Sequence, residues 1–141
     1  MSDTRRLPQL RSGRRAVSAL RAAASARDLR RVRALLDPDV SVVVDSGEPE
    51  RAKVRVVRGV EDASLLLAHG LGAQRGLEVA ERPVNGSPGL LLSRDGRRTA
   101  SIAVDLVGGL VSVVWVRLDP VPLRRGTSSD VPARSNRSEF S

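Results

Sequence analysis

The chain has 141 residues, enough for one domain with a real core, and it contains no cysteine. Disulfides, thiolate metal sites and cysteine nucleophiles are therefore excluded. Aromatic residues make up only 1% of the chain, so the core must be built from Val, Leu and Ala. No apolar run approaches the roughly 20 residues that a membrane span needs, and the arginine-rich N-terminus lacks the apolar stretch of a signal peptide. We therefore expect a cytoplasmic protein with no membrane partner.

The net charge of +8 is concentrated in the first 33 residues, where ten arginines stand against Asp3 and Asp28. Residues 34–141 carry fourteen basic and fourteen acidic side chains and are neutral overall. A basic arm can bind phosphates weakly and in a salt-sensitive way. This one has no interleaved aromatic residues and no recognised DNA-reading motif. A solvated or partner-facing segment is therefore favoured over nucleic-acid contact.

The first forty residues predict a disordered arm followed by two helices. Residues 1–13 are polar and include one proline and one glycine, which predicts disorder. The alanine-rich stretch 14–26 favours a helix with an apolar stripe on one face. A second helix is expected over 29–36, with Asp28 as its N-terminal cap.

The middle of the chain predicts short strands around a third helix. This helix is expected over 60–71, with Glu61 and Asp62 in its first turn, where acidic side chains stabilise the helix dipole. Apolar runs and alternating patterns predict strands over 40–45, 53–58 and 77–82.

The stretch Pro83–Leu118 contains three apolar runs that predict an antiparallel meander. The runs are 90–93, 99–106 and 110–118, and the dipeptides Asn85-Gly86, Asp95-Gly96 and Gly108-Gly109 punctuate the stretch. Asp-Gly and Gly-Gly pairs favour type I′ hairpin turns, in which both central residues have positive φ.

Helices followed by a run of antiparallel strands place the chain in the α+β class. Residues 124–141 are polar and poor in apolar side chains, which predicts a disordered tail. The expected division is a basic arm over 1–13, one domain over 14–123 and the tail.

Four stretches of the sequence together resemble the SnoaL-like, or nuclear transport factor 2-like, superfamily. They are LLDPDV at 35–40, Arg58-Gly59 before a helix, VNGSPGLLL at 84–92 and AVDLVGGLVSVVWV at 103–116. More narrowly, they resemble the C-terminal domain of actinobacterial extracytoplasmic-function sigma factors, over about residues 16–118. The chain departs from that pattern in the loop at 45–48, in the Gly-Gly turn and after Leu118.

The resemblance implies a cone, in which a curved antiparallel sheet packs on N-terminal helices and often encloses a pocket. It also implies a non-catalytic regulatory or small-ligand-binding module with a transcription-related protein partner. About fifteen residues precede the first predicted helix, so the DNA- and polymerase-binding regions of a sigma factor are not expected. The alternative is an enzyme, a SnoaL-like cyclase, isomerase or hydrolase acting on a small hydrophobic substrate in the cone pocket.

Four side chains are candidates for contact with a ligand. Asp105 lies within a predicted strand and shares a face with Ser101 and Ala103, so it can point into the cone or towards solvent. In the cone, an acid could serve general acid or base chemistry, with His69 as its partner. Trp115 could form a pocket wall or stack on a ligand, with Arg117 on the same face.

No catalytic set or cofactor site is expected from the remaining motifs. His69 is the single histidine, so a multi-histidine metal site is excluded. None of the turn glycines precedes a helix in a phosphate-binding arrangement, and no serine has an adjacent histidine. The open face of the predicted sheet is apolar at Val113, and we expect a homodimer through it.

Overall fold

The computed structural model describes residues 2–47 and 53–119, with side chains from Arg11 onward. Its helices are α1 (Ser2–Ser25), α2 (Leu29–Ala34) and α3 (Val60–Leu71). Its strands are β1 (Leu36–Asp45), β2 (Val54–Arg58), β3 (Leu77–Val84), β4 (Ser87–Arg94), β5 (Arg97–Val107) and β6 (Leu110–Leu118). The predicted α+β class is confirmed, and the third helix has the predicted bounds.

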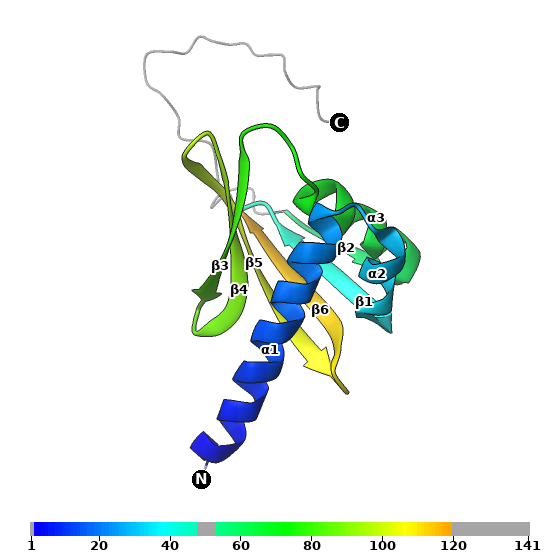
Figure 1. Cartoon of the computed structure of the whole chain (residues 1–141), viewed down its shortest axis with the longest axis vertical. Helices are drawn as coiled ribbons and strands as arrows, with labels where there is room; N and C mark the ends of the chain where they lie inside the picture. Colours follow the sequence, from blue (N-terminus) through cyan, green and yellow to red (C-terminus); the bar gives the residue numbers. More distant parts are fainter. Residues whose placement is uncertain (1, 48–52, 120–141) are drawn as a thin grey trace.

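The six strands form one curved, unclosed sheet in the order β2-β1-β6-β5-β4-β3 (Figure 1). Neighbours that are adjacent in sequence pair antiparallel, whereas β1 and β6 pair parallel in the middle of the sheet. The sheet is therefore mixed, and the wholly antiparallel sheet predicted from the sequence is wrong at this one junction. Hairpin turns can be predicted from local dipeptides, but the β1–β6 pairing joins segments far apart in the chain.

All three dipeptides of the meander form tight hairpin turns with positive φ at both central residues. The φ values are 52° and 80° at Asn85-Gly86, 53° and 84° at Asp95-Gly96, and 59° and 85° at Gly108-Gly109. Those signs are the ones that a type I′ turn requires. The turns predicted at Asp95-Gly96 and Gly108-Gly109 are confirmed, and Asn85-Gly86 forms a turn with the same signs of φ.

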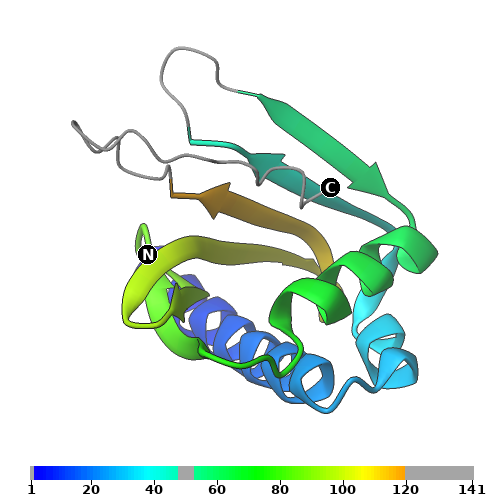
Figure 2. The same ribbon diagram turned by 90° about the horizontal axis from the view of Figure 1, so that it is seen from above.

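The core lies between the helices and one face of the sheet, here called the inner face. Figure 2 shows α1 lying within the curve of the sheet, with α2 and α3 at one end. Along β5, Ile102 and Val104 point to this face and are buried. On α1, Leu20 and Ala24 belong to the same core cluster and are 0% exposed. The core is aliphatic, as the composition requires.

Helix α1 begins at Ser2, so the predicted disorder of residues 1–13 is wrong for the described part of that segment. The glycine that the sequence suggested as a helix breaker serves packing instead. A Cβ added at Gly13 would lie 2.9 Å from Cγ of Pro88, so glycine allows α1 to approach β4 closely. Residues 124–141, for which a disordered tail is predicted, lie outside the described residues.

The short helix α2 ends before the predicted boundary because β1 begins earlier than expected. Asp28 caps this helix as predicted, accepting a hydrogen bond from the backbone N–H of Arg31 at 3.2 Å. Leu36 then pairs with Val111 of β6, and the Val111 N–H donates to the Leu35 carbonyl at 2.9 Å. Pairing with a distant strand thus takes Leu36 out of the helix.

Candidate functional site

The face of the sheet turned away from the helices, here called the outer face, carries an apolar row across four strands. The pairing registers bring Val56, Val43, Trp115 and Ala103 into line, on β2, β1, β6 and β5. Val56 is 45% exposed and Trp115 is 47% exposed. A large ring left half exposed at the middle of an apolar row is typical of a surface that meets another molecule.

Trp115 is held in place by Asp105 on the neighbouring strand. The indole Nε1–H donates a hydrogen bond to Oδ2 of Asp105 at 3.0 Å. Asp105 pairs directly with Val113, so it reaches Trp115 diagonally. The two predicted site residues therefore lie together, and the hydrogen bond fixes the orientation of the ring.

Charged side chains flank the apolar row on both sides, in rows that also contain the apolar Val54 and Val113. One row contains Asp45, Arg117 and Ser101, which the β1–β6 and β5–β6 registers place in line. The other runs from Arg58 on β2 across the sheet to Asp105 on β5. An apolar centre with a polar rim is the anatomy of protein–protein interfaces. Arg117 shares the face of Trp115, as its spacing predicts.

His69 and Asp105 do not form a couple. His69 is exposed near the end of α3, and α3 packs on the inner face through Leu67 and Leu71. Asp105 is exposed on the outer face, so of the two orientations that the sequence left open it takes the one towards solvent. The signal for its orientation was present in the sequence, because Ile102 and Val104 are the large apolar side chains of this strand and must take the inner face.

The interior of the cone is occupied by aliphatic side chains. Leu90 and Val114 of the sheet and Leu20 of α1 are all 0% exposed. A hollow of about 470 Å³ lies at the margin, between α1, the end of α3 and β3. Its lining mixes apolar side chains such as Leu77 with the polar Gln74.

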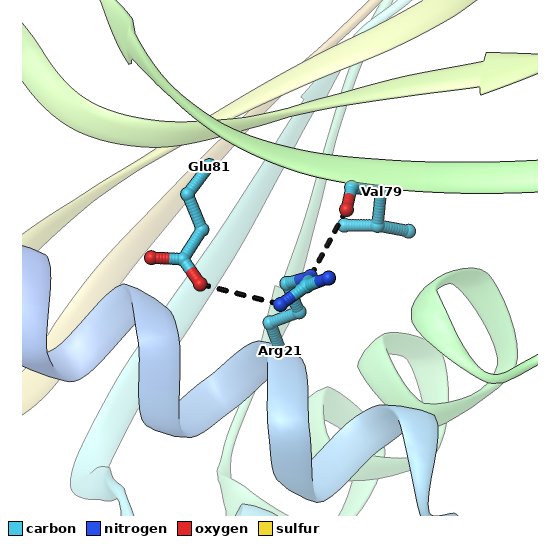
Figure 3. A network of polar contacts seen from close by, with 3 residues as sticks. All are labelled: Arg21, Val79 and Glu81. Atoms are coloured by element: carbon cyan, nitrogen blue, oxygen red, sulfur yellow. Dashed lines mark hydrogen bonds and ion pairs between the residues drawn. The ribbon is translucent and has the colours of Figure 1, made fainter.

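An arginine of α1 bridges to β3 beside this hollow (Figure 3). Arg21 donates from Nε to the carbonyl of Val79 at 2.9 Å and from Nη1 to Oε2 of Glu81 at 3.3 Å. Strand β3 is at the edge of the sheet, so its outward carbonyls have no strand partner. Arg21 therefore satisfies one edge carbonyl and ties α1 to the sheet.

Within residues 11–47 and 53–119, no three His, Asp or Glu side chains gather as metal ligands would. None of the helices in that part of the chain is long and apolar enough to cross a bilayer.

Solved structures of other proteins share this architecture. A candidate ketosteroid isomerase from Kribbella flavida is 18% identical, with 89% of this chain and 94% of that chain covered and a TM-score of 0.56. A nuclear transport factor 2-like protein of unknown function from Burkholderia xenovorans is 19% identical, with 89% and 98% covered and a TM-score of 0.55. The chain has the nuclear transport factor 2-like fold.

The nuclear transport factor 2-like fold also occurs in a protein with higher sequence identity. The extracytoplasmic function sigma factor SigJ of Mycobacterium tuberculosis is 30% identical over 77% of this chain, with a TM-score of 0.54. The match spans 42% of the sigma factor, in its C-terminal domain. No protein-family model and no curated protein matches the sequence. The predicted resemblance to the fold and to a sigma-factor domain is confirmed.

Proposed function

We propose that this chain is a non-catalytic regulatory module that works by protein–protein contact through its outer face. The observation that carries the proposal is the half-exposed Trp115, fixed by Asp105 at the centre of an apolar row. Tryptophan is among the residue types that most often dominate the binding energy of an interface once they are covered by a partner. The separation of Asp105 from His69 removes the acid–base couple that an enzyme could have used.

A second copy of the chain fits this face by charge. A twofold axis parallel to the strands, between β1 and β6, exchanges β6 with β1 and β5 with β2. Arg117 then faces Asp45 of the second copy, and Asp105 faces Arg58 of the second copy. Along the apolar row, Trp115 faces Val43 of the second copy. Both charge pairs are of opposite sign, so the outer face is complementary to itself.

The test of this homodimer is a charge reversal with rescue. The mass of the full chain is followed by sedimentation over a range of concentrations. Trp115→Ala is expected to weaken association about 30-fold or more, the usual effect of removing a central tryptophan. Arg117→Asp and Asp45→Arg should each weaken it, whereas the double variant restores it. Arg30→Asp, on α2, is the matched control and should have no effect.

Trp115 also provides a direct signal, because it is the sole tryptophan. Its fluorescence emission should move to shorter wavelength as the concentration rises and the ring is covered. A chain that stays monomeric at millimolar concentration, or a double variant that fails to restore association, would refute the homodimer.

The similarity to the sigma factor supports a transcription-related partner for the module. We expect RNA polymerase from the same organism, or a sigma factor bound to it, to bind the full chain. On the outer face this partner would take the place of the second copy, so surface-immobilised chain and purified polymerase should give saturable binding that Trp115→Ala abolishes and that excess free chain competes away. If the Trp115→Ala variant still binds polymerase, the partner contacts a surface other than the outer face.

A second candidate function is small-ligand binding in the hollow beside Arg21, favoured by its volume of about 470 Å³ and its partly apolar lining. An environment-sensitive naphthalene sulfonate dye is a suitable probe, because it joins an apolar body to an anionic group that Arg21 can bind. Ala73→Trp should fill the hollow and abolish dye fluorescence, while Trp115→Ala leaves it unchanged. The reverse pattern would show that the dye binds the outer face instead.

A further inference from the structure

A second surface, independent of the outer face, runs between α1 and the β3–β4 hairpin. Two hollows of about 570 and 320 Å³ adjoin there and share Arg14 and Glu81 in their linings. The first is bounded by Arg11 and Arg15 of α1, and the second by Arg82 and Pro88 of the hairpin. The surface that these two neighbouring hollows make up is called here the α1 groove.

The α1 groove is strongly basic. Arg11, Arg14, Arg15 and Arg82 line it, and none of them pairs with a carboxylate within residues 11–47 and 53–119. The acid in the groove, Glu81, is already engaged by Arg21 at 3.3 Å. Four cationic side chains are therefore left to attract an acidic ligand.

The walls of the α1 groove fit a polypeptide better than a nucleic acid. Pro88 lines the hairpin side, and Ala19 and Ala22 line the helix side, so aliphatic side chains could pack there. No aromatic ring lines either hollow, so bases would find nothing to stack on.

The chain itself does not supply a suitable occupant in its C-terminal sequence. Residues 120–141 contain four arginines against Asp130 and Glu139, so this segment has the same sign of charge as the α1 groove. We propose that the α1 groove binds an acidic segment of another polypeptide that also carries aliphatic side chains.

The experiment measures binding of a fluorescein-labelled peptide of alternating glutamate and leucine to the full chain, by anisotropy at low salt. Arg14→Gln combined with Arg15→Gln is expected to weaken binding about three- to tenfold, the effect of losing two exposed ion pairs. Arg82→Gln, on the other wall, should weaken it in the same direction. Arg30→Gln combined with Arg31→Gln is the matched control, since these are also adjacent exposed helix arginines, and should leave affinity within twofold.

Each other outcome contradicts the proposal. Equal weakening by the two double variants would show non-specific attraction to a basic protein. Tighter binding of a twenty-residue oligothymidine, lost with Arg14→Gln and Arg15→Gln, would make the α1 groove a nucleic-acid site. Loss of peptide binding with Trp115→Ala would move the binding to the outer face. Circular dichroism of every variant checks that folding is unchanged.

Discussion

The inner and outer faces of the sheet are made by the same strands but differ in their side chains and in what covers them. On β5, Ile102 and Val104 enter the core, while the alternate residues Ser101 and Asp105 point outward. The inner face is covered by helices of its own chain. The outer face combines a half-exposed tryptophan with charges at its rim, so it has apolar area to bury and a pattern to select a partner. Side chains of the inner face therefore stabilise the fold, whereas side chains of the outer face are available to contact a partner.

The largest expected effect compares neighbouring leucines of β4 on the two faces. Leu90 is 0% exposed in the core, and Leu90→Ala should lower the free energy of unfolding by about 2–5 kcal/mol through lost burial and a cavity. Leu91, on the outer face and half-buried, should cost about 1 kcal/mol or less when changed to alanine. Urea unfolding midpoints measure both. Equal losses would mean that the outer face is covered in the folded monomer.

An intermediate effect tests the close packing of β4 at Gly89. A Cβ at Gly89 would collide with the Ile102 carbonyl and lie 2.7 Å from Cγ2 of Val84. Gly89→Ala should therefore destabilise the protein by about 1–3 kcal/mol, because the strands must move apart. Gly70 in α3 has nothing within 4 Å of such a Cβ. Gly70→Ala is the matched control and should stabilise by about 0.5–1 kcal/mol, seen as a raised Tm.

The smallest expected effect concerns the bridge that closes the margin of the inner face. Glu81→Gln removes the charge that pairs with Arg21 across the α1–β3 boundary. Both side chains are well exposed, so the loss in unfolding free energy should be about 0.2–1 kcal/mol and should fade at high salt. A loss that does not change between low and high salt would point to packing rather than charge.

Local patterns in the sequence predicted the parts of the fold that local forces decide. The structure has hairpin turns at Asp95-Gly96 and Gly108-Gly109 and the third helix at the predicted positions. The start of α1 was missed, because helix-breaking rules count Gly13 against a helix and cannot see Pro88 packed upon it. The parallel β1–β6 pairing was missed for a similar reason, since no local signal records a register between distant strands.

The candidate site was predicted in part. Trp115, Asp105 and Arg117 do share one face, which follows from the two-residue period of a strand. Alternation alone does not say which face of the sheet meets the helices. The large apolar side chains Ile102 and Val104, which alternate with Asp105 on β5, indicate that their own face is the buried one. Three of the arginines behind the excess charge of the first 33 residues, Arg11, Arg14 and Arg15, line the α1 groove, which the sequence did not predict. Arg82 could be added only by the fold, which brings the hairpin against α1.

The parallel pairing at the centre of the sheet also governs the order in which the protein can assemble. Val42 of β1 pairs with Val114 of β6, so the middle of the sheet closes only when almost the whole described chain is available. Until then, the β1–β2 hairpin presents an unpaired, valine-rich edge. Such distant pairing slows folding and leaves that edge open to intermolecular pairing. During synthesis, β1 must wait for the last strand to leave the ribosome, and interruption before Leu110 would release an aggregation-prone fragment.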